Sequence, residues 1–128
     1  MDEIKFLAVH TDARPTMDFT RERELIEGGG GILKLTQAST EEELISNVKD
    51  ANGLLVLGAQ ITRQVIEAMP KCQVMVRYGV GLDTLDIPAA TEHGIVVAHF
   101  PDFCQPEVAN QAILLLLACA KKLTLLDQ

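Results

Sequence analysis

The chain has 128 residues, of which 48% are hydrophobic and 23% are charged, a balance that fits one globular domain and excludes a disordered segment. The formal net charge is −7, and aromatic residues make up only 4% of the sequence. Because nucleic-acid binding relies on clustered Lys or Arg side chains and on aromatic stacking, we expect no nucleic-acid partner.

The cysteines favour neither a disulfide framework nor structural zinc. Cys72, Cys104 and Cys119 are widely spaced, form no Cys-x-x-Cys pair and have no histidine nearby at ligand spacing, so we expect no metal site. The N-terminal residues 1–5 are acidic and do not show the basic patch and apolar core of a signal peptide. The sequence therefore predicts a reducing, cytoplasmic setting.

The first part of the chain alternates apolar strands with polar turns and helices. Residues 4–9 form an apolar run that predicts a strand, and the polar loop 10–15 follows it. The polar groups of that loop could serve a site or could be solvated turn residues. A surface helix is predicted at 18–27, the glycines at 28–31 end it, and a strand follows at 32–35.

The alternation continues through the middle of the chain. Thr40 and Glu43 form a capping-box pattern, and Thr62 and Asp86 also stand where a helix N-cap is expected. Further helices are predicted at 40–48, 62–69 and 86–93, and further strands at 53–58, 74–76 and 95–98. This order predicts an α/β fold with a five-stranded, doubly wound parallel sheet.

A long apolar helix is predicted at 106–126. Pro106 suits its first turn, and Cys104 or Gln105 could cap it. Because Leu, Ala, Val and Ile occur on every side, we expect burial in a large core or an interface. Polar residues bound the apolar run too soon for a good membrane span. A single sheet domain covers one helix face, so the other face should meet a missing domain or another copy of the chain.

Four loops should meet at the carboxyl edge of the sheet, where such folds bind ligands. They comprise residues 10–14, 58–60, 77–81 and 99–105. The Gly79-Val80-Gly81 segment could turn backbone N–H groups toward a carboxylate or phosphate. It could equally be an ordinary tight connection, and a dinucleotide fingerprint would need a further glycine at the position of Thr84.

The three histidines are candidate bases at different places. His10 and His99 end strands at the ligand edge, so either could touch a substrate. His93 precedes Gly94 at a helix C-terminus, where a cation is favourable.

Several spaced motifs occur in one order: Arg77-x-Gly79-x-Gly81-x-Asp83-x-x-Asp86, Ala89-Ala90, Gly94-Ile95-x-Val97, and Glu107-Val108-Ala109 opening a Leu-rich helix. With these motifs, residues 53–128 resemble the N-terminal part of the D-isomer-specific 2-hydroxyacid dehydrogenases, which include phosphoglycerate, hydroxypyruvate and formate dehydrogenases. The resemblance implies a flavodoxin-like substrate domain at 1–100. Residues 101–128 would be a linker and interdomain helix leading to a missing NAD-binding Rossmann domain.

The resemblance also implies roles for individual residues. The Gly79-Val80-Gly81 loop would bind the carboxylate of a 2-oxo or 2-hydroxy acid. Substrate contacts would further include Arg77, Tyr78 and Cys104, and contacts with NAD or NADP would come from Val80, Cys104, Gln105 and Val108. Arg77 would help to set specificity, although a surface salt-bridge partner is an equal alternative.

The family's cofactor fingerprint and its catalytic Arg, Glu and His lie in the second domain, so this chain would hold no catalytic residue. We therefore expect a fragment of an NAD(P)-dependent oxidoreductase that interconverts a D-2-hydroxy acid and a 2-oxo acid, without turnover by the 128 residues alone. A homodimer through the 106–126 helix is the expected assembly, with no membrane partner.

Three other classes of protein share features with this sequence. The alternative is a standalone, noncatalytic module that binds a small acid or dimerises. A phosphoacceptor receiver domain would need an aspartate after the third strand, where Leu57-Gly58-Ala59 stands. A cysteine hydrolase could use Cys104 at a helix N-terminus, but no positioned His–acid pair is evident.

Overall fold

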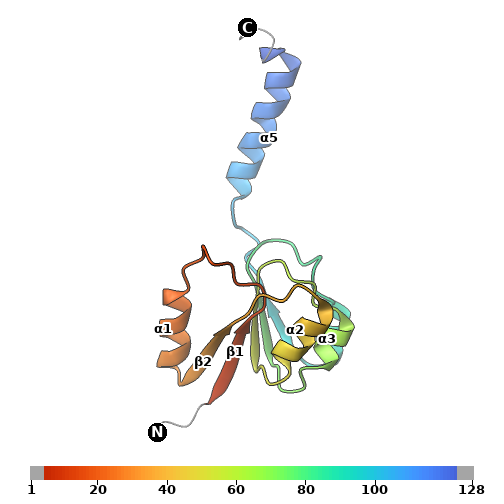
Figure 1. Ribbon diagram of the computed structural model, residues 1–128. Coiled ribbons are helices and arrows are strands. Elements are labelled where there is room, and N and C mark those ends of the chain that lie inside the picture. The colour runs from red at the N-terminus through yellow and green to blue at the C-terminus, as the bar shows by residue number, and fades with distance from the viewer. Residues whose placement is uncertain (1–4, 124–128) are drawn as a thin grey trace.

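Strands and helices alternate along the computed structural model, which describes residues 5–123 (Figure 1). The elements are β1 (Phe6–His10), α1 (Thr20–Gly28), β2 (Gly31–Leu35), α2 (Glu41–Val48), β3 (Gly53–Val56), α3 (Arg63–Glu67), β4 (Val74–Arg77), α4 (Ile87–Glu92), β5 (Val96–Ala98) and α5 (Gln105–Ala120). The expected order of elements is confirmed, with boundaries that shift by at most two residues except at the end of α5, which the structure places at Ala120 instead of residue 126.

The strands form one parallel sheet in the order β2-β1-β3-β4-β5. This is the flavodoxin-like order, so the predicted fold class is confirmed. α1 lies on one side of the sheet, and α2 and α3 lie on the other (Figure 1). The loops that follow β1, β3, β4 and β5 consequently meet at one edge.

Most of the core fills the space between the sheet and the α2–α3–α4 layer. Val9, Leu54 and Met75 from three adjacent strands are buried there with Val65 and Ile66 from α3. A smaller cluster under α1 consists of Ala8, Phe19 and Leu33. β3 lies in the middle of the sheet, and its Leu54 and Val56 are buried while Gly53 and Leu55 are partly exposed.

The predicted helix caps form, with one change. The Ala89 N–H donates to Asp86 Oδ1 at 2.9 Å, and the Glu43 N–H donates to Thr40 Oγ1 at 3.2 Å. The return bond of the capping box does not reach the Thr40 amide. Glu43 instead accepts from the Ser39 N–H at 2.8 Å, one residue earlier.

The Phe6 ring of β1 lies directly over Gly31 of β2 and occupies the space that a side chain at position 31 would need. A Cβ there would lie 2.4 Å from Cε2 of the Phe6 ring. We expect Gly31→Ala to lower the free energy of unfolding by about 1–2 kcal/mol, because the ring must shift. Gly28→Ala is the control, since no atom lies within 4 Å of its Cβ position. Urea denaturation measures the free energy of unfolding of both variants. Equal stability of the two variants would contradict the predicted clash at position 31.

α5 differs from the expectation in its start and its surroundings. It begins at Gln105, and Cys104 precedes it in a left-handed conformation (φ 57°) without a side-chain cap. The Gln105 Nε2 donates to the Pro101 carbonyl at 2.8 Å rather than capping the helix. No residue of α5 is buried, and the helix projects away from the sheet (Figure 1). The expected packing of one face on this domain is therefore wrong.

The end of the expected 106–126 helix lies partly outside the described residues. Within the part of the chain that the structure describes, no helix combines the length and apolar character needed to cross a membrane.

Candidate functional site

The loop after β4 is held in place by the strands on both sides. The Tyr78 N–H donates to a carbonyl of β3 at 2.8 Å, and the Phe100 N–H donates to the Gly79 carbonyl at 3.2 Å. The Nδ1 of His99 lies 2.9 Å from the Val80 carbonyl oxygen. His99 thus braces the loop from the segment after β5, a role that the sequence pattern did not indicate.

Two backbone amides of this loop remain available. Among the hydrogen bonds of residues 5–123, none uses the N–H of Val80 or Gly81 as donor, and both residues are exposed. Gly79 has φ +153°, in the region that favours glycine, and so sets the turn that precedes these amides. Where consecutive backbone N–H groups point the same way, they form a concavity that suits an oxyanion.

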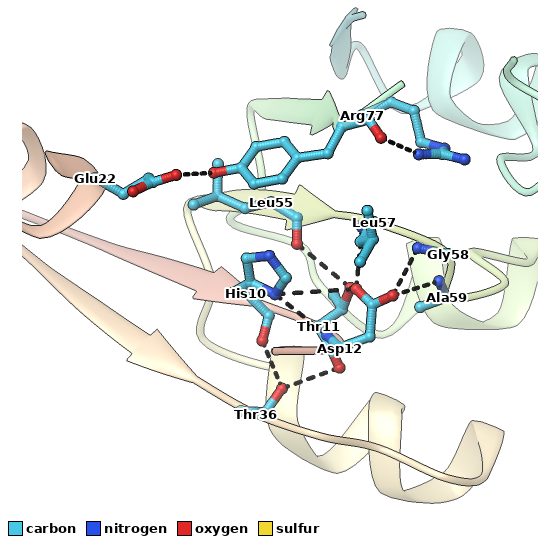
Figure 2. Close-up of polar contacts among 11 residues, drawn as sticks. His10, Thr11, Asp12, Glu22, Thr36, Leu55, Leu57, Gly58, Ala59 and Arg77 are labelled. Atoms are coloured by element: carbon cyan, nitrogen blue, oxygen red, sulfur yellow. Dashed lines mark hydrogen bonds and ion pairs between the residues drawn. The ribbon is translucent and has the colours of Figure 1, made fainter. Parts of the chain in front are cut away.

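Arg77 places a positive charge against the same loop. Its Nη1 donates to the Tyr78 carbonyl at 2.6 Å (Figure 2), and it lies 2.9 Å from where a Cβ of Gly79 would stand. Its Nε is buried and has no partner among the described residues. Arg77 takes part in none of the salt bridges found among those residues, so the surface ion-pair alternative has no support from residues 5–123.

Tyr78 turns away from Arg77 toward α1. Its O–H donates to Glu22 Oε1 at 3.0 Å (Figure 2). Burial, together with the hydrogen bond and negative charge of Glu22, raises the pKa of Tyr78 to about 12. The phenol is therefore a neutral donor at physiological pH.

A cavity of about 600 Å³ opens beside the loop, between α1 and the segments after β4 and β5. Its lining residues are Arg21, Glu22, Leu25, Leu57, Tyr78, Gly79, Phe100 and Phe103.

The loop after β3 is occupied by an acidic side chain of the same chain. The Asp12 carboxylate accepts from the backbone N–H groups of Leu57 at 3.0 Å, Gly58 at 2.6 Å and Ala59 at 3.1 Å (Figure 2). Thr11 Oγ1 adds a fourth bond at 2.9 Å. These bonds explain why β3 ends at Val56 rather than at the expected Gly58.

Burial alone would raise the pKa of Asp12. The hydrogen bonds from Leu57, Thr11 and Gly58, with a smaller contribution from His10, outweigh that effect and lower the pKa below its usual value. Asp12 is therefore a structural anion that fixes the β3–α3 loop, not a solvated turn residue.

His10 ends β1 at the ligand edge, but its side chain points into the protein interior. It is fully buried, with its ring 4.7 Å from Phe19 and 5.5 Å from Tyr78 between centroids. Its Nδ1 accepts from the Asp12 N–H at 3.4 Å, and its Nε2 has no partner among the described residues. Burial lowers the pKa of His10, and the charges of Asp12 and Glu22 oppose this only partly. The expectation that His10 could touch a substrate is wrong.

Comparison with known proteins identifies the family. The D-isomer specific 2-hydroxyacid dehydrogenase catalytic domain matches residues 9–113. The chain belongs to the D-isomer-specific 2-hydroxyacid dehydrogenase family. It is 42% identical over 94 residues to D-3-phosphoglycerate dehydrogenase of Methanocaldococcus jannaschii, which covers 73% of this chain and 18% of that protein. It is 37% identical over 90 residues to glyoxylate reductase of Thermofilum pendens, a match that covers 70% of this chain and 26% of that protein.

Solved structures show the same fold for this dehydrogenase-family chain. The NAD⁺-bound 3-phosphoglycerate dehydrogenase of Entamoeba histolytica has a TM-score of 0.75 and 28% identity, over 88% of this chain and 38% of that one. D-lactate dehydrogenase of Aquifex aeolicus has a TM-score of 0.73 at 19% identity, over 94% and 35%, which supports the fold alone. The chain thus spans between 18% and 38% of the length of these relatives.

The remaining site predictions for this member of the family fall at the base of α5. Cys104 is partly buried, Gln105 bonds to the 101–102 turn, and Val108 is exposed. No hydrogen bond within residues 5–123 joins Cys104 or Gln105 to the 79–81 loop. No group of His, Cys, Asp or Glu among those residues could hold a metal ion.

Buried His10 and partly buried Asp12 together predict a stepwise loss of stability in acid. Because folded His10 has a lowered pKa, the unfolded chain protonates first, and stability falls as the pH drops below the ordinary histidine value of 6.5. Asp12 stabilises the fold above its ordinary value of 3.8, and this contribution is lost as the pH falls through the lower folded value.

Urea denaturation across this pH range measures the effect. His10→Gln should remove the first loss, whereas the control His93→Gln, at an exposed position, should retain it. A free energy of unfolding for the unsubstituted chain that stays constant from neutral pH to about pH 4.5 would contradict the role of His10.

Proposed function

We propose that this chain supplies the carboxylate-binding part of an NAD(P)-dependent oxidoreductase that interconverts a D-2-hydroxy acid and a 2-oxo acid. The observation that carries the proposal is a pair of exposed residues, Val80 and Gly81, whose N–H groups donate to no acceptor within residues 5–123, next to Gly79, against which the Arg77 guanidinium lies. Family membership supports the reaction type.

The loop offers a carboxylate two backbone donors and the positive charge of Arg77, which offsets the negative charge of Asp83 beside Gly81. A carboxylate has two oxygens that accept in one plane, so each can take one N–H of consecutive residues. Arg77 contributes a permanent positive charge, and its Nε has no hydrogen-bond partner within residues 5–123. Fixing the carboxylate would orient the adjacent carbon, which is the reacting atom of a 2-hydroxy acid.

A nicotinamide coenzyme, NAD or NADP, would supply the hydride acceptor or donor. Residues of this chain fit only the rim of such a site, because the Gly79-x-Gly81 loop has Thr84 where the dinucleotide fingerprint has another glycine. We propose Val80, Cys104, Gln105 and Val108 as that rim. We also propose that 1–100 is the substrate domain and that 101–128 leads to a coenzyme-binding domain.

The 128 residues alone should not turn over substrate. A general acid or base must reach the substrate oxygen. Of the histidines, His10 is buried, His99 is engaged with Val80, and His93 lies at the far end of α4.

Because all three cysteines are free thiols, the proposal includes a reducing, cytoplasmic compartment.

Titration of the ¹⁵N-labelled chain with glyoxylate tests the proposed function. The amide resonances of Val80 and Gly81 should shift and saturate, and Arg77→Gln should weaken binding about tenfold through loss of a charge-assisted contact. Arg63→Gln is the matched control, since Arg63 pairs with Glu92 on α3 and α4. Unchanged Val80 and Gly81 resonances at high glyoxylate concentration would refute the proposal.

We further propose that α5 pairs two copies of the chain as a homodimer. Leu114, Leu116 and Leu117 are 57%, 69% and 54% exposed, more apolar surface than a free helix normally leaves in water. Sedimentation velocity should detect a dimer that the double substitution Leu114→Gln with Leu117→Gln converts to monomer. Leu25→Gln, also on an exposed helix face, should leave the dimer intact. A monomer at every concentration would contradict the pairing.

A further inference from the structure

We infer that the acid bound at this site carries a branched aliphatic or aromatic substituent, which enters the cavity beside Gly79. The inference rests on the proposed carboxylate-binding function and specifies the substrate class of the same site. It follows from the position, the lining and the charge of the cavity of about 600 Å³.

The position of the cavity follows from a shared residue. Gly79 lines the cavity and directly precedes Val80, whose amide is one of the two proposed carboxylate donors. Consecutive Cα atoms are only about 3.8 Å apart. A 2-oxo acid anchored at Val80 and Gly81 therefore has its substituent within reach of the cavity mouth.

The lining of the cavity is mainly apolar. Phe100 and Phe103 come from the segment after β5, Leu25 comes from α1, and Leu57 follows β3. Phe103 and Leu25 are 65% and 70% exposed in the free chain, so an apolar ligand group would remove them from water. A concave apolar surface with few polar groups is the usual form of a small-molecule site.

The polar groups of the lining do not favour an anionic substituent. Arg21 is the one cation among the lining residues, and the neighbouring Glu22 carries the opposite charge. The Tyr78 O–H is already donated to Glu22 at 3.0 Å. A phosphate in this cavity would lose its hydration without gaining a net positive surrounding. Glyoxylate, which has no carbon substituent, would leave the cavity unfilled.

Competing acids distinguish these possibilities. The ¹⁵N-labelled chain is titrated with glyoxylate, 4-methyl-2-oxopentanoate, phenylpyruvate and 3-phosphohydroxypyruvate, with the Val80 and Gly81 amides as the readout. We expect the branched and aromatic acids to bind about tenfold more tightly than glyoxylate, because several carbons leave water. The phosphorylated acid should bind no more tightly than glyoxylate.

A charge placed in the cavity should change this order. Leu25→Lys, at a largely exposed position, should abolish the preference for the branched acid and improve binding of the phosphorylated one. Val96→Lys is the control, because Val96 is 65% exposed and does not line the cavity, and it should keep the original order.

Each remaining outcome has one meaning. Tightest binding of the phosphorylated acid by the unsubstituted chain, or equal binding of all four acids, would overturn the inferred substrate class and leave the carboxylate site standing. Failure of every acid to shift Val80 and Gly81 would overturn the carboxylate site and, with it, the inference.

Discussion

Replacing Asp12 with Asn should lower the free energy of unfolding by about 3 kcal/mol, because a charged acceptor of several backbone bonds is lost. The carboxylate accepts hydrogen bonds from the backbone N–H groups of Leu57, Gly58 and Ala59. The NH₂ group of an Asn side chain would instead face these donors with two N–H donors of its own. The expected result is a lower urea midpoint with an unchanged slope.

The control for this substitution is Asp18→Asn. Asp18 also accepts a backbone N–H, that of Thr20 at 2.9 Å, but it is exposed and bonds only within its own turn. Asp18→Asn should lower the free energy of unfolding by about 1 kcal/mol or less. Equal effects of the two substitutions would show that Asp12 does not fix the β3–α3 loop.

Gly79→Ala should weaken carboxylate binding by more than about tenfold and destabilise the fold by about 1–3 kcal/mol. The residue has φ +153°, and a Cβ would stand 2.9 Å from the Arg77 Nη1. The backbone must therefore change conformation, the guanidinium must move, or both. Either change displaces the Val80 and Gly81 amides from their present arrangement.

Gly58→Ala is the matched glycine control for this prediction. Its Cβ position lies at an ordinary 3.6 Å from the nearest atom, Asp12 Oδ2, and its amide is already bonded to that carboxylate. Isothermal titration with glyoxylate and urea denaturation should show near-normal binding and stability. A Gly79→Ala variant that binds glyoxylate as well as Gly58→Ala does would argue against the 79–81 loop as the carboxylate-binding site.

The fold was predictable because its signals are local. The apolar run of β3 and the caps at Thr62 and Asp86 depend on residues within a few positions of one another. The α5 pattern indicated a helix that needs cover, and the structure leaves it exposed within residues 5–123. Apolar periodicity specifies that a surface must be buried but not which surface buries it.

The site was only partly predictable, since several of its contacts join distant residues. The glycine spacing indicated a turn at Gly79–Gly81, where Gly79 does have a positive φ, but nothing local indicated that Asp12 would fill the neighbouring loop from 45 to 47 positions away. The bond of Tyr78 to Glu22 spans 56 positions and is equally invisible to a pattern. The one feature of the sequence that could have indicated the contact of Asp12 with the β3–α3 loop is the presence of an aspartate in the loop after the first strand.

The most direct test of the proposed site is a crystal structure of the 128-residue chain with oxamate, a stable analogue of a 2-oxo acid. The carboxylate oxygens should lie about 2.8–3.0 Å from the backbone nitrogens of Val80 and Gly81. Oxamate bound instead to the amides of the Leu57–Ala59 loop, with Asp12 displaced, would contradict the assignment.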